Sequence, residues 1–310
     1  MKTVRFAGTD LTASAVVAGM MRITDLSDAD IVALVDAALA AGITMFDHAD
    51  IYGGDHGCET RFGDALKWSP SQRQSVILQT KCGIVPGDPT YYDFSHDHII
   101  ARVEGSLRAL RTDYIDILLL HRPDSLVEPA EVAQAFDELQ AAGKVRYFGV
   151  SNQTPGQIAL LERYVRQPLV ANQVQLSLTH APLIAQGIAV NMAAEAQSVS
   201  LDLGLLDFAR LHDITLQAWS PFQGGFFTGV FLGDPAYAEL GTVLDRLAAQ
   251  YDITPMGVAT AWITRHPASI QVVTGTTKPA RLAEAAAGSD VVLTRAEWYE
   301  LFKAAHHIIP

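Results

Sequence analysis

The stretch ITMFDHADIYGG, residues 43–54, decides how the rest of the chain is interpreted. Its first half, with Ile43, Met45 and Phe46, is a dense apolar run typical of a strand buried on both faces of a parallel sheet. The run ends directly in a polar cluster that comprises Asp47, His48, Asp50 and Tyr52. Carboxylates in such a place are partly desolvated, so they need partners or a chemical role. The alternative is that one of the two aspartates caps the next helix.

Length and composition favour one large α/β domain. With 310 residues, the chain has room for two ordinary domains or for one α/β barrel, which takes about 250 residues plus insertions. Hydrophobic residues make up 49% and charged residues 18%, which provides material for a large core. No linker or low-complexity tract divides the sequence. We therefore predict a single domain over residues 1–310.

Charge and cysteine content limit the expected partners and the compartment. A formal net charge of −12 argues against nucleic acid, because phosphate binding needs concentrated lysine and arginine. No run approaches the ~18 apolar residues of a membrane helix, and residues 13–21 do not fit a signal peptide. Cys58 and Cys82 lack ligand-like spacing, which is typical of thiols kept reduced in a cytosol. We expect a cytoplasmic protein that binds neither nucleic acid nor membrane, with its oligomeric state left open.

Outward from residues 43–54, strands and helices alternate along the chain. Residues 3–14 predict an N-terminal β-hairpin that plugs one end of a barrel. A strand at 16–21 precedes a helix at 28–41, which Ser27 and Gly42 cap. The strand and helix ranges that follow are 43–47 and 58–68, 76–81 and 98–110, 115–120 and 129–142, 145–150 and 155–164, 170–176 and 201–212, 215–219 with 243–250 and 255–265, and 270–274 and 279–287.

Eight strand-then-helix units favour a closed (β/α)8 TIM barrel, because such strands pair in parallel through right-handed crossovers. A doubly wound nucleotide-binding fold is the competitor, but its G-x-G-x-x-G fingerprint is missing after the first strand, where GMMR stands at residues 19–22. The functional residues of such barrels lie just past the carboxyl ends of the strands. Here those ends carry Asp47, Tyr52, Lys81, His121, Ser151, Asn152, Gln173, Trp219 and residues 274–278.

The order of these residues resembles the aldo-keto reductases, a family of NAD(P)H-dependent carbonyl reductases on a (β/α)8 barrel. The resemblance rests on an Asp, a Tyr five residues later, a Lys at the end of the next strand and a His at the end of the one after, which here are Asp47, Tyr52, Lys81 and His121. The motifs GVSN, NQ and WSP, at 149–152, 172–173 and 219–221, extend it over nearly the whole chain. The segments FDHADIYGG and LLLHRPD are similar to those of a bacterial subgroup of this family.

The chemistry of these four side chains suits a single task, the delivery of a proton to a carbonyl oxygen. Hydride reduction of a carbonyl needs a proton donor at the developing alkoxide, and a phenol with a pKa near ~10 becomes usable beside a cation. We predict that Lys81 lowers the pKa of Tyr52, and that Asp47 keeps Lys81 charged. His121 would donate a hydrogen bond that aims the carbonyl oxygen. Each residue also has a structural alternative. Lys81 and Asp47 could form a structural ion pair, His121 could be an imidazole with satisfied hydrogen bonds at a strand end, and Tyr52 could be a loop aromatic.

The cofactor assignment combines side-chain chemistry with the resemblance. The indole of Trp219 can stack on a nicotinamide, and Ser151, Asn152 and Gln173 offer groups that would bind its carboxamide. An ordinary core role for the indole is the alternative. The candidate cofactor residues are Met20, Met21, Asp47, Ser151, Asn152, Gln173, Trp219, Ser220, Pro221, Phe222, Gly275, Thr276, Thr277, Lys278, Arg281 and Glu284.

The resemblance also implies how the rest of the cofactor is bound. Residues 222–229 would cover the pyrophosphate, and GTTKPARLAE, residues 275–284, would bind the 2′-phosphate. NADPH/NADP+ is therefore favoured over NADH. Two positions depart from the family pattern, since Gly275 stands where some relatives carry Lys and Ala285 where many carry Asn.

The expected activity is NADPH-dependent reduction of an aldehyde or ketone to an alcohol, with the natural small-molecule carbonyl left open. Candidate substrate walls are the loop 83–95, with its aromatic residues Tyr91, Tyr92 and Phe94, and the segment 177–200. The residues His48, Met21 and Arg122 also fall near the predicted mouth. Two alternatives stay open, an NADP(H)-binding regulatory barrel with little turnover and a Schiff-base lyase that uses Lys81. No metal site is predicted, because His96, His98, His306 and His307 lack matching acids or thiols.

Overall fold

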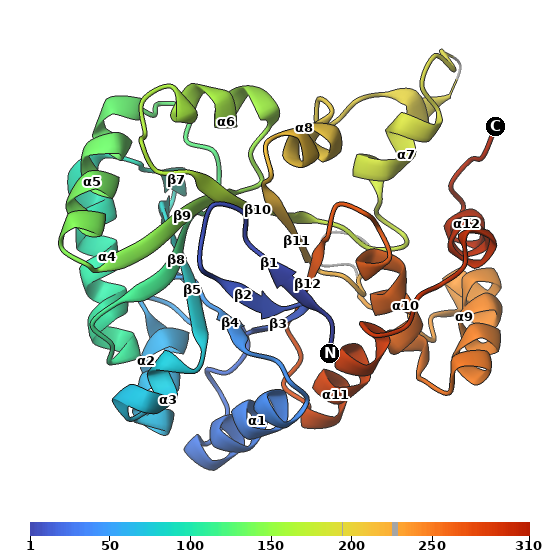
Figure 1. Cartoon of the computed structure of the whole chain (residues 1–310), viewed down its shortest axis with the longest axis horizontal. Helices are drawn as coiled ribbons and strands as arrows, with labels where there is room; N and C mark the ends of the chain where they lie inside the picture. The colour runs from blue at the N-terminus through green and yellow to red at the C-terminus, as the bar shows by residue number, and fades with distance from the viewer. Residues whose placement is uncertain (194, 225–228) are drawn as a thin grey trace.

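A closed barrel of parallel strands forms the frame of the computed structural model, which describes residues 1–193, 195–224 and 229–310 (Figure 1). The barrel strands are β3 Val16–Gly19, β4 Met45–Asp47, β5 Ile77–Cys82, β8 Ile115–Leu120, β9 Val145–Ser151, β10 Leu169–Gln175, β11 Thr215–Trp219 and β12 Gln271–Thr274. They are neighbours in that order, and β12 pairs with β3 to close the ring. The predicted TIM barrel is confirmed; that the whole chain is one domain stays a prediction.

Helices surround this barrel (Figure 1). They are α1 Asp28–Ala40, α2 Gly57–Leu66, α3 Pro70–Gln74, α4 His96–Leu110, α5 Pro129–Ala141, α6 Pro155–Glu162, α7 Pro182–Ile188, α8 Leu205–Leu211, α9 Ala238–Tyr251, α10 Pro255–Thr264, α11 Pro279–Gly288 and α12 Arg295–Ala304, with 3-10 turns η1 Ala196–Ser198 and η2 Pro235–Tyr237. In the described part of the chain, no helix has the length and apolar character needed to span a membrane.

Most predicted elements are found with shifted ends. Ser27 caps α1 as expected, since its hydroxyl accepts a hydrogen bond from the backbone N–H of Asp30 at 3.2 Å. The cap at the other end is Ala41 rather than Gly42, which follows it at a φ of 82°. Sequence analysis does not predict α3, α7 or α12. The first two are shorter than two helical turns, so they offer too few residues for a periodic apolar pattern.

Two apolar layers lie on either side of the strands. The outer layer packs strands against helices, and the inner layer fills one end of the barrel. That inner layer contains Val17, Met45, Ile77, Ile117, Leu119 and Val273, together with Phe6, Leu11 and Ala13 from the N-terminal segment. Hairpin strands β1 Thr3–Arg5 and β2 Thr12–Ser14 are antiparallel, and Phe6 between them is fully buried. The predicted N-terminal plug is therefore confirmed.

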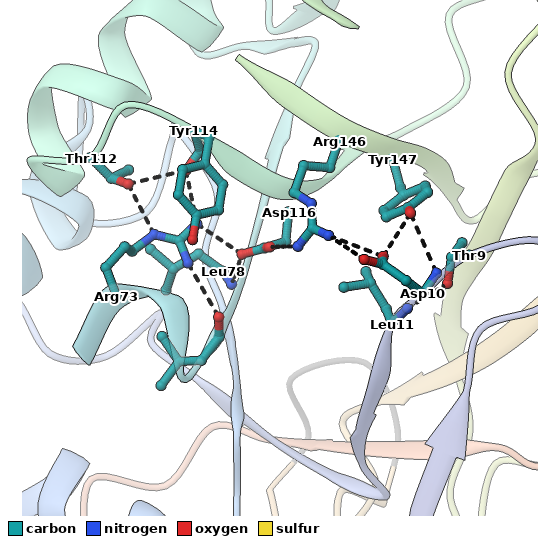
Figure 2. A network of polar contacts seen from close by, with 11 residues as sticks. Thr9, Asp10, Leu11, Arg73, Leu78, Thr112, Tyr114, Asp116, Arg146 and Tyr147 are labelled. Atoms are coloured by element: carbon teal, nitrogen blue, oxygen red, sulfur yellow. Dashed lines mark hydrogen bonds and ion pairs between the residues drawn. The ribbon is translucent and has the colours of Figure 1, made fainter. Parts of the chain in front are cut away.

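A polar network ties the plug to the barrel, as Figure 2 shows. Asp116 on β8 is buried and accepts hydrogen bonds from Arg73 of α3 at 2.8 Å and from Arg146 of β9 at 2.9 Å. Arg146 also donates to both carboxylate oxygens of Asp10 in the hairpin loop, at 3.0 and 2.9 Å. The Tyr147 hydroxyl donates to Asp10 at 2.7 Å. Asp116 thus holds two cations at the floor of the barrel.

Replacing Asp116 by alanine should lower the free energy of unfolding by about 3–5 kcal/mol, because removing one member of a buried pair leaves uncompensated charge. Asp10→Ala is the matched control, since Asp10 binds the same Arg146 but its side chain is 68% exposed. We expect it to cost at most about 1 kcal/mol. Urea unfolding of both variants checks this. Equal losses would contradict the assignment of Asp116 as the centre of the network.

Candidate active site

Polar side chains meet at the carboxyl end of the barrel. Asp47 is the last residue of β4, Lys81 lies near the end of β5, and His121 directly follows β8. Tyr52 lies in the turn after β4. Since all the barrel strands run in parallel, their carboxyl ends come together at the same opening. The four side chains, which are far apart in sequence, therefore lie close together in the fold.

Lys81 is the centre of the cluster. Its side chain is fully buried, and its Nζ donates to Oδ2 of Asp47 at 2.7 Å, to the backbone oxygen of His48 at 2.8 Å and to the hydroxyl of Tyr52 at 3.3 Å. Two of the three acceptors therefore come from the turn that follows β4. The predicted contacts of Lys81 with Asp47 and with the phenol are present.

Buried amides hold the other oxygen of Asp47. Its Oδ1 accepts hydrogen bonds from Nε2 of Gln79 at 2.6 Å and from Nε2 of Gln173 at 3.0 Å. Both amides also donate to Oε1 of Gln217, at 2.9 and 3.1 Å. Gln79 and Gln217 are not among the site residues that the sequence predicts. The signal was available, because each stands two residues before a predicted site residue, Lys81 or Trp219, and alternate strand residues share a face.

Burial and the charges within the cluster together set the pKa values of Lys81 and Tyr52. Burial by itself would lower the pKa of Lys81, but the Asp47 carboxylate and Tyr52 outweigh it, so the net pKa is raised and the ammonium is kept. For Tyr52, burial is the largest influence and raises the pKa of the phenol above its ordinary value, although Lys81 acts to lower it. The predicted lowering effect of Lys81 is present, but burial outweighs it. Lys81 limits the rise.

His121 lies beside the phenol with its ring neutral. The ring centroids of His121 and Tyr52 are 5.8 Å apart at an interplanar angle of 83°. Burial, followed by the charges of Lys81 and Arg122, holds the pKa of His121 well below its usual range. A neutral imidazole has one N–H to donate, which fits the predicted role of a hydrogen-bond donor.

The predicted nicotinamide residues form a connected chain of hydrogen bonds. Nε1 of Trp219 donates to Oδ1 of Asn152 at 3.0 Å, and Nδ2 of Asn152 donates to Oγ of Ser151 at 2.7 Å. Ser151 in turn donates to the backbone oxygen of Gln173 at 2.8 Å. The Gln173 side chain supports Asp47, so only its backbone belongs to this chain. The orientation of the indole is thus fixed by its N–H.

The predicted phosphate segment leads from β12 into α11. Gly275, Thr276 and Thr277 are partly buried, whereas Lys278 and Arg281 are exposed. Arg22, which sequence analysis did not select, donates from Nη1 to the backbone oxygen of Gly275 at 2.9 Å. It brings another guanidinium to this segment. No sequence motif marked it, because the contact joins residues 253 positions apart.

The remaining predicted cofactor residues differ in how much of each side chain is exposed. The Met20 side chain is 1% exposed and lies in the outer apolar layer, and its backbone N–H donates to the oxygen of Asp47 at 2.9 Å. Its contact with the cofactor stays a prediction. Met21, Ser220 and Glu284 are half-buried, whereas Pro221 and Phe222 are buried. Of the loop 222–229, residues 225–228 lie outside the described residues, so the predicted pyrophosphate cover stays a prediction.

The candidate substrate walls are only partly as expected. Loop 83–95 contains a small hairpin, β6 Ile84–Val85 and β7 Tyr91–Tyr92, whose two tyrosines are exposed. Phe94 is instead 1% exposed and belongs to the outer apolar layer. His48 does not face the mouth either, because its fully buried ring packs edge-on against Phe62 of α2 at 4.6 Å. Segment 177–200 contains α7 and η1, and residue 194 lies outside the described residues.

Helix α4 holds the turn that carries Tyr52. Arg102 donates from Nε to Oδ2 of Asp50 at 2.7 Å and from Nη1 to Oδ1 of Asp55 at 2.7 Å. The backbone N–H of Asp50 donates to the oxygen of Lys81 at 3.0 Å. Asp50 is fully buried, and burial, partly offset by Arg102, raises the pKa of its carboxyl to about 6. Neither Asp47 nor Asp50 caps α2, whose N-cap residue is His56.

Histidine pairs of the sequence do not assemble into a metal centre among the described residues, where no group of three or more His, Cys, Asp or Glu side chains could hold an ion. His96 instead contacts Oδ1 of Asp97 at 2.8 Å and Oε2 of Glu138 at 3.0 Å. It therefore acts as part of a surface ion-pair group.

Comparisons with known proteins agree with this geometry. A model of the Aldo/keto reductase family matches residues 15–305. The chain is 40% identical to "Uncharacterized oxidoreductase YcsN" of Bacillus subtilis and 37% identical to the 6-dehydroglucose reductase of Agrobacterium fabrum, in each case covering 95% of both chains. It superposes with a TM-score of 0.76 on an aldo-keto reductase from Klebsiella pneumoniae crystallised with NADPH, which is 26% identical, covering 97% of this chain and 94% of that one.

Asp50→Asn should change how stability depends on pH. The pKa of Asp50 is about 6 in the folded protein, against ~3.9 in an unfolded chain. The folded state therefore binds this proton more tightly, so the contribution favours folding below pH ~4 and is lost as the pH rises through about 6. Relative to the variant, the wild type should lose up to roughly 3 kcal/mol of unfolding free energy across that window.

Urea unfolding at several pH values measures this difference. Asp55→Asn is the matched control, because Asp55 binds the same Arg102 and its side chain is 79% exposed. Its stability curve should run parallel to that of the wild type. A parallel curve for Asp50→Asn would show that Asp50 does not titrate in this window.

Proposed function

The chain belongs to the aldo/keto reductase family of oxidoreductases, and from that membership we propose that it reduces an aldehyde or ketone to an alcohol with NADPH. The observation that carries the proposal is the placement of the Lys81 ammonium, 2.7 Å from Asp47 and 3.3 Å from the Tyr52 hydroxyl at the barrel mouth. This is the arrangement that a proton donor for a carbonyl oxygen requires.

Tyr52 is the proposed proton donor. When the carbonyl accepts a hydride, negative charge develops on its oxygen, and the proton of the Tyr52 hydroxyl passes to that oxygen. The resulting phenolate lies against the Lys81 ammonium, which stabilises it. Because burial raises the pKa of Tyr52, this stabilisation is needed for the transfer. Asp47 keeps Lys81 charged throughout, as the raised pKa of Lys81 indicates.

His121 is proposed to orient the substrate oxygen. Its ring is neutral at physiological pH because its pKa is held well below the usual range. A neutral imidazole donates a hydrogen bond without supplying a second acid, so the proton comes from Tyr52 alone. The ring lies next to the phenol, which lets both groups address one oxygen atom.

The described residues fit NADPH by the chemistry of their donors, and NADPH when bound supplies the hydride. Trp219, with its N–H fixed on Asn152, offers a flat face for the nicotinamide. Lys278 and Arg281 lie at the start of α11, where backbone N–H groups and side-chain cations favour a 2′-phosphate. The Klebsiella neighbour was crystallised in complex with NADPH, which supports the same choice over NADH.

A sugar-like carbonyl is the substrate class that we propose. The Agrobacterium relative is a 6-dehydroglucose reductase. In this chain, the Arg122 guanidinium lies 5.6 Å from the centroid of Trp219 and directly follows His121 in sequence. An aromatic face packs against the C–H groups of a sugar, and a guanidinium donates to adjacent hydroxyls. The pair therefore suits a polyhydroxylated aldehyde or ketone.

The Schiff-base alternative is disfavoured by the electrostatics of Lys81. An imine-forming lysine must lose its proton to attack a carbonyl. Here the pKa of Lys81 is raised, and its Nζ lies 2.7 Å from the Asp47 carboxylate. The regulatory-barrel alternative uses the same cofactor residues as the reductase. A measurement of turnover distinguishes the two, because a regulatory barrel would bind NADP(H) with little turnover.

Tyr52→Phe should reduce kcat by about 100-fold to 10,000-fold, because it removes the proton donor without changing the shape of the site. Consumption of NADPH, and of NADH in parallel, over a panel of aldehydes, ketones and aldehyde sugars measures this. Tyr147→Phe is the matched control at the opposite end of the barrel and should keep wild-type turnover. Binding of NADPH by both variants, followed by its fluorescence, shows that the fold is intact. Unchanged turnover in Tyr52→Phe would contradict the proposed role.

Arg122→Leu should raise KM for 6-dehydroglucose by about tenfold or more, because hydrogen bonds from a charged group are lost. The value of kcat/KM for propanal, which has no hydroxyls to bind, should change by less than about threefold. Arg108→Leu, on the exposed face of α4, is the control. An equal loss for both substrates would contradict the sugar preference while leaving carbonyl reduction itself in place.

A further inference from the structure

A cavity of about 570 Å³ lies on the outside of the barrel, apart from the strand-end cluster. It is bounded by α7, α8, the turn before β12 and α12, and Figure 1 shows these elements outside the ring of strands. None of its lining residues belongs to the predicted catalytic or cofactor set. Its size falls in the range of about 300–1,000 Å³ that small-molecule sites occupy.

Apolar side chains form one part of the wall. Leu183, Ile184 and Ile188 come from α7, and Trp298 comes from α12. The Trp298 ring is 8% exposed and stacks on Trp262 with centroids 5.0 Å apart and planes 9° apart. Each of these two indoles also donates its N–H to the backbone oxygen of the other residue, at 3.1 and 3.0 Å. The wall is therefore preformed and suits an apolar ring or chain.

Positively charged side chains form the other part of the cavity wall. The arginines Arg210, Arg265 and Arg295 line the cavity, and Asp207 is the one carboxylate that lines it among the described residues. None of the three arginines pairs with a carboxylate within 4 Å in the part of the chain that the structure describes. Seven other arginines do form such pairs, namely Arg61, Arg73, Arg102, Arg111, Arg146, Arg166 and Arg246. The cavity thus brings three guanidinium groups together against one carboxylate among the described residues, in a chain of net charge −12.

The pKa of His266 indicates the sign of the electrostatic field in the cavity. It lies in the turn before β12, it lines the cavity, and it is half-buried. Its pKa is lowered to about 4, first by burial and then by Arg210 and Arg265, against the opposing effect of Asp207. The cations therefore outweigh the carboxylate at this position. An anion placed here would be attracted and would offset the repulsion.

We propose that this cavity is a second binding site, for a small amphipathic anion with its apolar body against Trp298 and its carboxylate, sulfonate or phosphate against Arg210, Arg265 and Arg295. The combination of a preformed aromatic wall with guanidinium donors matches the anatomy of anion-binding pockets. The proposal is independent of the reductase activity.

The test uses the full chain saturated with NADP+, so that the probe does not report on the cofactor site. The probe is 8-anilinonaphthalene-1-sulfonate, compared with its uncharged analogue N-phenyl-1-naphthylamine, and fluorescence titration gives Kd and stoichiometry. We expect one sulfonate per chain, bound at least about tenfold more tightly than the analogue. Arg210→Gln combined with Arg295→Gln should weaken the sulfonate about tenfold or more and leave the analogue unchanged.

Arg108→Gln, at an exposed position on α4 outside the cavity lining, should leave the binding of both ligands unchanged. A second measurement covers the case of a double variant that fails to fold. In the wild type, the pKa of the His266 imidazole, followed by NMR, should rise when the sulfonate binds. Equal affinity for the two probes, or a His266 pKa that stays at its starting value on saturation, would overturn the proposal.

Discussion

The buried ion pair between Lys81 and Asp47 is the interaction on which the rest of the site depends. A fully buried ammonium loses its proton unless a nearby negative charge compensates for the lost solvation. Asp47 provides that charge at 2.7 Å, and the amides of Gln79 and Gln173 provide hydrogen bonds to its second oxygen. The three N–H groups of Lys81 are directed at Asp47, at the backbone oxygen of His48 and at the Tyr52 hydroxyl. Of these three acceptors, only the Tyr52 hydroxyl carries a proton that it can give up, so the pair holds the ammonium against the phenol.

Support for this pair comes from outside the barrel as well as from within. Helix α4 contacts both the turn after β4 and helix α2, which follows that turn. Arg102 binds Asp50, and Ser106 donates to Glu59 at 3.0 Å, while Glu59 also contacts His56 at the start of α2. Two neighbouring helices therefore fix a turn whose middle contains Tyr52. The position of the hydroxyl is set by polar contacts made more than 40 residues away in sequence.

The sequence predicted the parts that depend on local patterning. Strand and helix alternation gave the barrel, and strand ends gave the cluster of Asp47, Tyr52, Lys81 and His121. What it could not give were contacts between distant segments, such as Arg22 with Gly275. The direction of the Tyr52 pKa also depends on burial, which a sequence does not display. His48 was misplaced for a related reason, because a strand-end residue can point toward the helices as well as toward the mouth.

The apolar floor of the barrel has a consequence for proton supply. Phe6, Leu11 and Val17 belong to a layer that fills the end opposite the cluster, and such packed apolar layers exclude water. In the proposed reaction, the Tyr52 hydroxyl gives up its proton in each cycle and must regain one before the next. Because this packed layer keeps water from the closed end, the proton in that reaction would return through the open mouth of the barrel, by the route that the product takes out.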